Sequence, residues 1–229
     1  MKNPLYKLVL LLTLFFSSGV YSQKVIDFQK IYGSDPLLYN GRLYRFYQPA
    51  STKGYPFLYE KFSIGEIKLR GQHYPDQLIN FDIHNGQLVL QYTSPDGGIN
   101  RIIVSEAWLE NFEVNGSVFE PVDIGNSNIA ICKVLKADKI SLAYNLRKDL
   151  IMDNTIGAVN MQFSKPIRTA YLVSPNKSQR YTNNKSFISF FDDNIQQEIK
   201  KYMRKNRINV KKSGDQEMTG LLNFCSTLI

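Results

Sequence analysis

Apolar and polar residues alternate along much of the stretch 39–181, and this period of two is typical of β-strands. Ile79, Phe81 and Ile83 would face one side of such a strand, with polar residues between them. Short glycine turns separate the alternating segments: Asn40-Gly41, Arg70-Gly71, Asn85-Gly86, Gly97-Gly98 and Asn115-Gly116. Asn-Gly tolerates the positive φ of tight hairpins, so we predict an antiparallel β-meander in which each strand pairs with its neighbour.

A second β-rich stretch covers residues 129–181. Its expected strands are 129–135, 139–144, 159–163, 167–173 and 179–181. We therefore predict a mainly β fold over residues 23–182, either an antiparallel meander or an open barrel-like sheet. This β portion forms either one core or two sub-sheets, at 39–119 and 129–181, and the pattern does not decide between them.

The spacing of apolar residues changes from two to three or four after Asn183. Ile195, Ile199 and Met203 recur at helical spacing, and Asp192 or Asp193 can cap the helix that carries them. A last helix, from about residue 215, would present one apolar face consisting of Met218, Leu221, Leu222, Cys225 and Leu228. We predict that residues 183–229 form a short C-terminal helical tail that packs on the sheet.

The first 22 residues have the pattern of a secretory signal peptide. Lys2 and Lys7 precede an apolar run at 8–16, and small or polar residues follow it. A membrane-spanning helix needs about 20 apolar residues, and this run is roughly half that length. We interpret 1–22 as a cleavable signal and expect export to the periplasm or beyond the cell, with no transmembrane span after its removal.

The chain has two cysteines, Cys132 and Cys225. In the oxidising environment that an exported protein meets, a pair of thiols can become a disulfide. One hypothesis is that this bond clamps the helical tail to the sheet. The alternative is two buried free thiols, which are common core residues, and the sequence favours neither.

Basic residues exceed acidic ones by 28 to 20, and much of the excess lies at 185–212. Within that segment the expected helix carries a basic surface of Lys200, Lys201, Arg204 and Lys205. Such a surface can meet anionic lipid or an acidic partner, although a solvated helix face is the plainer interpretation. Nucleic acid is not an expected partner of an exported protein.

Tyrosines gather early in the chain, and four of them are candidate ligand-binding residues: Tyr44, Tyr47, Tyr59 and Tyr74. On a sheet face their rings could stack on sugars or peptides. The alternative, which strand propensity favours, is that they fill half-buried positions of the sheet.

Reactive constellations are missing from the sequence pattern. Its two histidines, His73 and His84, lack metal-ligand spacing, and no nucleophile elbow or phosphate-binding loop is present. Acidic residues are scattered through the β portion as solvated carboxylates would be: Glu60, Glu66, Asp82, Glu106 and Glu110. We therefore predict no catalytic residue, no metal site and no cofactor.

Several short segments carry a resemblance. They are Tyr39–Tyr44 (YNGRLY), Gly54–Phe57 (GYPF), Gly65–Ile67 with Tyr74, Phe190-Phe191, Glu198–Tyr202 (EIKKY) and Lys205–Ile208 (KNRI). In these segments, and in Gln23 directly after the expected cleavage site, the chain resembles a group of secreted Bacteroidota proteins of unknown function. The resemblance implies export and a similar architecture, and it brings no activity and no catalytic residue with it.

Three functions are compatible with these observations. The first is a non-catalytic exported protein of the cell envelope that binds a partner, such as an envelope protein or a glycan, through its β-sheet surface. The second is a hydrolase that acts on glycan or peptide through paired carboxylates. The third is a membrane-surface protein that uses the basic C-terminal helix.

Overall fold

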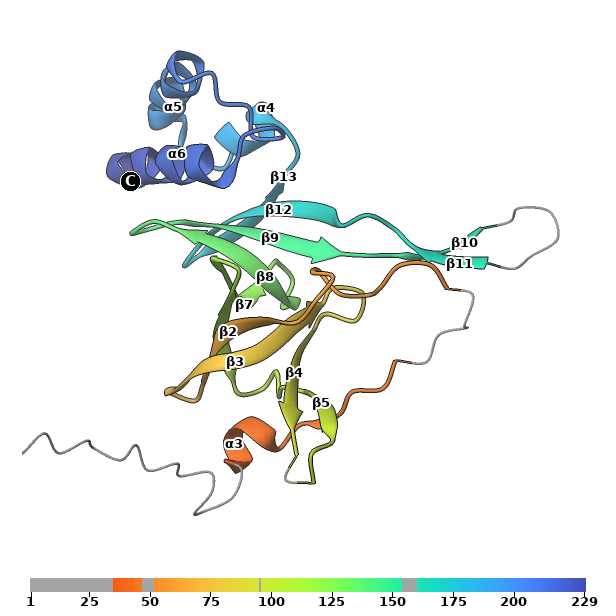
Figure 1. Ribbon diagram of the computed structural model, residues 1–229. Helices are drawn as coiled ribbons and strands as arrows, with labels where there is room; N and C mark the ends of the chain where they lie inside the picture. The colour runs from red at the N-terminus through yellow and green to blue at the C-terminus, as the bar shows by residue number, and fades with distance from the viewer. Residues whose placement is uncertain (1–34, 47–51, 95, 154–159) are drawn as a thin grey trace, which may run out of the picture. The chain divides into compact units, whose positions relative to one another are not determined.

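The computed structural model describes residues 35–46, 52–94, 96–153 and 160–229. The expected signal peptide and Tyr47 lie outside these ranges. The described chain is mainly antiparallel β-sheet followed by a helical tail, which confirms the predicted fold class (Figure 1).

One sheet contains strands from both predicted β stretches. It consists of β1 (Arg42–Leu43), β2 (Ser63–Leu69), β3 (Gln72–Asp82), β4 (Gln87–Thr93), β5 (Ile99–Ile103), β6 (Leu109–Val114), β7 (Ser117–Asp123), β8 (Ile129–Lys136), β9 (Ser141–Arg147), β12 (Ile167–Ser174) and β13 (Lys177–Tyr181). Their order is β1-β5-β4-β3-β2-β6-β7-β8-β9-β12-β13. The sheet is not closed into a barrel, because β1 and β13 are its two edges. A separate ribbon pairs β10 (Leu150–Asp153) with β11 (Asn160–Phe163).

The sheet departs from a simple meander at β2, which pairs with β3 on one side and with β6 on the other. Ile67 is thus opposite Tyr74 in one neighbour and Phe112 in the other. The chain leaves β5 and returns to the open edge of β2 before continuing through β6. Alternation along a strand predicts which face of the strand is buried, but it does not predict which strand pairs with it. The sequence pattern therefore could not predict that β6 pairs with β2.

Two of the predicted glycine turns, Arg70-Gly71 and Asn115-Gly116, are two-residue hairpin turns of the sheet. Arg70-Gly71 joins Leu69 to its partner Gln72, and both turn residues have positive φ, 45° and 79°. Such a two-residue turn matches the right-handed twist of the strands on either side. The hairpin predicted at Asn85-Gly86 forms with a longer loop, because the last pair of its ladder joins Asp82 to Gln87.

Buried apolar side chains form separate clusters on the one sheet. In the first cluster Phe81, Phe112 and Phe119 pack together, with the rings of Phe112 and Phe119 stacked at 4.9 Å between centroids. The second cluster joins the strands β8, β9 and β12 to the helices, and Leu146 packs against both clusters. The β portion is therefore continuous in its hydrogen bonding and divided in its apolar packing.

The helical tail comprises α4 (Asn184–Ile188), α5 (Asp193–Lys205) and α6 (Asp215–Leu228), while the short α3 (Pro36–Tyr39) precedes the sheet. Met218, Leu221 and Leu222 of α6 are fully buried in the second cluster, as their spacing predicted. Asp192 is the N-cap residue of α5, although its side chain makes no capping hydrogen bond. The three helices lie together beside β12 and β9 (Figure 1).

Within the described ranges no helix has both the length and the apolar composition that a membrane crossing needs.

Candidate functional site

Three of the four tyrosines of the predicted ligand-binding surface are described, and each makes contacts within the fold. Tyr44 donates its phenol hydrogen to Asp82 Oδ2 at 2.8 Å, and burial together with that carboxylate raises the pKa of the phenol above its usual value. Tyr59 and Tyr74 are half-buried against the first cluster. These three side chains serve the packing of the β portion, and Tyr47 lies outside the described residues.

Asp82 is fully buried and is the centre of a polar cluster at the end of β3. Besides the Tyr44 phenol, its carboxylate accepts hydrogen bonds from the backbone N–H groups of His84 and Asn85, each at 3.0 Å. The Asn85 amide adds a further donor at 2.8 Å. A buried carboxylate needs such partners, because an unpaired charge away from water is costly. The cluster therefore fixes the β3–β4 loop.

Lys148, directly after β9, is a second buried charge with only 7% of its surface exposed. Its ammonium donates to the carbonyl oxygens of Phe57, at 2.7 Å, and Tyr55, at 3.1 Å, and it lies 4.0 Å from the centre of the Tyr55 ring. Burial lowers the pKa of the Lys148 ammonium, and the nearby Asp82 carboxylate opposes that shift. The lysine thus holds the 55–57 segment against the sheet.

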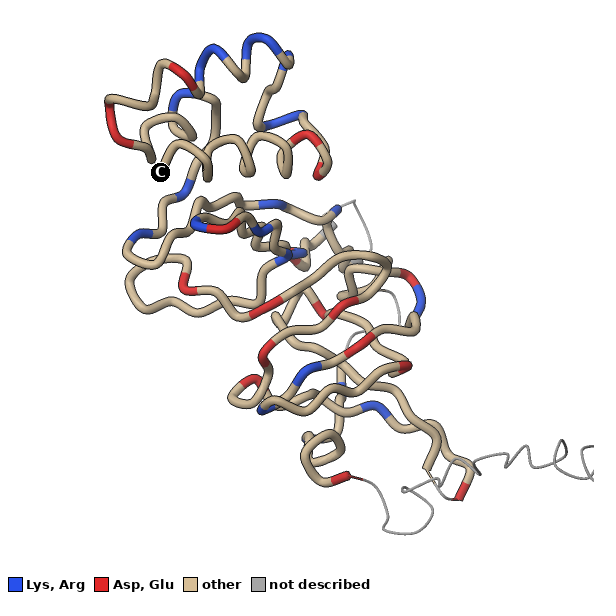
Figure 2. The backbone as a smooth tube through the Cα atoms, turned by 90° about the vertical axis from the view of Figure 1, so that its left-hand side faces the viewer, with Lys and Arg blue, Asp and Glu red and all other residues tan. Residues whose placement is uncertain are grey.

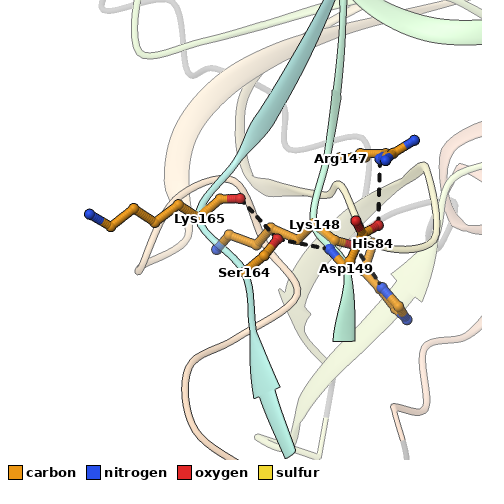
Figure 3. A network of polar contacts seen from close by, with 6 residues as sticks. All are labelled: His84, Arg147, Lys148, Asp149, Ser164 and Lys165. Atoms are coloured by element: carbon orange, nitrogen blue, oxygen red, sulfur yellow. Dashed lines mark hydrogen bonds and ion pairs between the residues drawn. The ribbon is translucent and has the colours of Figure 1, made fainter. Parts of the chain in front are cut away.

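Figure 3 shows the contacts that continue this network through the backbone. His84 Nδ1 lies 2.9 Å from the carbonyl oxygen of Lys148, so the ring donates from Nδ1. The Asp149 carboxylate forms an ion pair with Arg147 at 3.4 Å. The backbone N–H of Asp149 donates to Ser164 Oγ at 3.0 Å. Each of these polar groups has a partner within the fold, so the network holds these segments together.

A cavity of about 350 Å³ lies beside this network, between the β3–β4 loop and strands β7, β8 and β9. His84, Asn145 and Arg147 line it, and among the described lining residues Glu106 is the single acidic one. Glycoside hydrolysis by the usual route needs two carboxyl groups that flank the substrate. This cavity has the polar groups to hold a small molecule but lacks that pair. Across the described residues, moreover, no cluster of three or more His, Cys, Asp or Glu could hold a metal ion.

The two cysteines are free and buried, so the disulfide hypothesis does not describe this structure. Lys133 of β8 reaches Asp215 of α6 at 2.5 Å, which places the Lys133 side chain on the helix side of the sheet. Since successive strand residues face opposite sides, Cys132 points away from the helices, whereas Cys225, a residue of α6, is buried in the second cluster. Burial raises the pKa of each thiol to about 12, so neither is a reactive nucleophile.

The larger candidate site is a groove of about 780 Å³ in the helical tail. Four basic side chains line it: Lys185 of α4, Lys200 and Arg204 of α5, and Arg207 of the following turn. Ile188, Met203 and Ile208 contribute apolar surface, and the amides of Asn184, Gln196, Gln197 and Asn209 complete the wall. We call this cavity the basic groove. Figure 2 shows how basic positions gather along this part of the chain.

The charges of the basic groove are uncompensated. No acidic residue lines it, and within the described part of the chain none of its four basic side chains forms an ion pair. All four line an open surface, while Met203 and Ile208 beneath them are buried. Positive charges around a low-dielectric floor focus a positive potential into a concave site. The groove can therefore hold an anion that also carries apolar surface.

Helical spacing divides the predicted basic surface into two pairs. Lys200 and Arg204, one turn apart, line the basic groove, whereas Lys201 and Lys205 do not. The apolar side of the same helix is turned inward, since Ile199 is fully buried in the second cluster. The helix therefore keeps no free apolar face of the kind that an interfacial membrane helix inserts.

The sequence pattern places Lys185 and Arg207 within the basic segment and does not assign them to the site. They join it because Asn184 ties α4 to the turn after α5: its Oδ1 accepts from the N–H of Val210 at 3.0 Å, and its Nδ2 donates to the carbonyl oxygen of Ile208 at 3.3 Å. No periodicity within one helix could have predicted this contact between two elements.

Comparisons of the chain with protein-family models, with curated proteins and with solved structures find no match. A function for this chain is therefore inferred from the geometry of its own residues.

Proposed function

We propose that this chain is a non-catalytic binding protein that holds an anionic ligand in the basic groove of its helical tail. The observation that carries the proposal is the convergence of four unpaired cations, from α4, α5 and the next turn, on one cavity without an acidic residue. Two like charges at positions i and i+4 of a helix destabilise it slightly. Lys200 and Arg204 are such a pair, and an anionic ligand would relieve their repulsion.

The other hypotheses have less support. A sheet-surface binding site would need the tyrosines to be available, and Tyr44, Tyr59 and Tyr74 are engaged in packing or hydrogen bonds. A hydrolase would need a second carboxylate beside Glu106 in the cavity between the β3–β4 loop and strands β7, β8 and β9. A membrane-surface function would need an apolar helix face, and the apolar residues of α5 are in the core.

Export is part of the proposal and rests on the sequence pattern of residues 1–22. An exported binding protein meets acidic surface polymers and partner proteins rather than the nucleic acids of the cytoplasm. The basic groove would then act between the chain and another component of the envelope or the medium.

The experiment is a binding titration of the mature chain with fluorescently labelled poly-glutamate, read by anisotropy. The test variant is K200E/R204E, and the matched control is K201E/K205E, which makes the same change of charge on the same helix outside the groove. We expect the test variant to weaken binding by about tenfold or more, and the control by roughly twofold, since long-range charge alone is screened by salt. Equal losses in both variants, or no binding by the wild type, would overturn the proposal.

A further inference from the structure

A second basic cavity lies next to the basic groove. It has a volume of about 290 Å³, and Arg168 of β12, Arg180 of β13 and Lys211 line it. The other described residues of its wall are threonine, alanine, valine and tyrosine, so none of its described lining residues is acidic. We call it the second basic cavity.

The groove and the second basic cavity share one wall. Ile208 and Asn209 line the groove, and Val210 and Lys211, the next residues, line the second basic cavity. The hydrogen bond from the Val210 N–H to Asn184 Oδ1, 3.0 Å long, joins a residue of one cavity to a residue of the other. A ligand that leaves the groove across this turn therefore meets a further set of positive charges.

The cations of the second basic cavity are held without an acidic partner. Arg168 donates from Nη2 to the carbonyl oxygen of Lys211 at 3.3 Å, and its guanidinium lies 4.8 Å from the centre of the Tyr144 ring. These contacts orient the guanidinium and leave its charge uncompensated. Arg180 and Lys211 are exposed and, within the described residues, form no ion pair. Charges positioned before binding lose less entropy when a ligand arrives.

We propose that the ligand is an extended acidic peptide segment of a partner protein, which lies in the basic groove and continues into the second basic cavity. This inference rests on the proposed function and names its ligand. A peptide fits the groove because one apolar side chain can cover the half-buried Ile188 while flanking carboxylates meet the cations. The amides of Gln196 and Asn209 can pair with its backbone, as polar groups in ligand sites commonly do.

Two other classes of ligand fit less well. Sugar rings are commonly held on aromatic faces, and no aromatic residue is among the described residues that line the basic groove. An anionic membrane is a broad surface, and it would meet the rim of a groove rather than the buried apolar side chains Met203 and Ile208 at its floor. Polysaccharide and lipid binding are therefore outcomes that would count against the inference.

The test uses labelled peptides and the mature chain. The short peptide has about six residues, with a central leucine between glutamates. Each of the two long peptides adds about six further residues, glutamates and serines, to the short one. One is extended at the N-terminus and the other at the C-terminus. We expect one of the long peptides to bind about tenfold tighter than the short one. R180E/K211E should remove that gain and weaken the short peptide by no more than roughly twofold. K200E/R204E should weaken all three peptides by about tenfold or more, and K201E/K205E by no more than roughly twofold.

Replacing the peptide leucine by serine should weaken every peptide several-fold, and circular dichroism of each protein variant checks that it is folded. Equal affinity of the long and short peptides, or an R180E/K211E variant that keeps the gain, would overturn the inference while leaving the proposed function standing. Tighter binding to polygalacturonate or to vesicles with phosphatidylglycerol would overturn it in favour of the other classes. If no probe depends on Lys200 and Arg204, both proposals fail.

Discussion

The ammonium of Lys148 lies 2.7 Å from the carbonyl oxygen of Phe57, although the two residues are 91 positions apart in the chain. Phe57 is also bridged to Asp82, and Leu58 donates its N–H to the carbonyl oxygen of Phe81 at 2.8 Å. Lys148 thus satisfies backbone acceptors in a segment that covers the end of β3. A buried lysine with two carbonyl partners holds an irregular segment that has few backbone partners of its own.

Replacing Lys148 by methionine keeps the apolar stem and removes the ammonium. We expect a loss of roughly 2–3 kcal/mol of unfolding free energy, because the carbonyl oxygens of Tyr55 and Phe57 lose their donor in a buried place. Urea unfolding followed by circular dichroism measures this loss. The matched control is K165M at an exposed lysine of the same region, which should change stability by less than about 0.5 kcal/mol. Equal stability of the two variants would show that Lys148 is not a clamp.

Replacing Asp82 by asparagine changes little volume but points an amide donor at groups that already donate. The carboxylate accepts from Tyr44, His84 and Asn85, so we expect D82N to cost roughly 1.5–3 kcal/mol, the range for hydrogen bonds to a charged group. Y44F removes one of these donors and should cost about 1 kcal/mol. In a double-mutant cycle the two changes should be less than additive, because they remove the same hydrogen bond. Strict additivity would contradict the cluster.

Because both thiols are buried, we expect the free energy of unfolding to fall at alkaline pH. In the folded chain the pKa of Cys132 and Cys225 is about 12, against an ordinary value of 9.0, so the unfolded chain ionises first. Their contribution is complete below pH 9 and is lost as the pH rises from 9 towards 12, by at most about 1.4 kcal/mol per pH unit and thiol. Urea midpoints at about pH 8, 9 and 10 should therefore fall less steeply for C132A/C225A than for the wild type. Parallel curves would contradict the burial of the thiols.

The charges of the basic groove predict the opposite of a stabilising role. Lys200 and Arg204 repel each other across one helical turn, so K200Q/R204Q should raise stability by a few tenths of a kcal/mol. The gain should shrink between about 20 mM and about 500 mM salt as the repulsion is screened. Thermal unfolding at the two salt concentrations measures it. A clear loss of stability would contradict the prediction, because it would mean that Lys200 and Arg204 stabilise the folded chain.

The short-range features of this protein could be predicted from the sequence. The turn at Arg70-Gly71 follows from the ease with which glycine takes positive φ, and the buried face of α6 follows from helical spacing. The predicted strand at 167–173 and the predicted last helix from 215 agree with the observed bounds to within a residue or so. Each of these depends on neighbours within a few residues, which is the range over which backbone sterics and side-chain periodicity act.

By itself, then, the sequence determined a mainly β chain, the faces of its strands and helices, and a basic helical tail. Only the tertiary structure decided that β2 lies between β3 and β6, that Cys132 and Cys225 are buried in different apolar clusters, and that Lys185 and Arg207 join Lys200 and Arg204 around one groove. The physical reason is that strand neighbours and helix contacts are chosen by the joint burial of apolar faces and the pairing of backbone groups across the whole chain. Neither the joint burial nor the backbone pairing produces a periodic pattern within the sequence of a single segment.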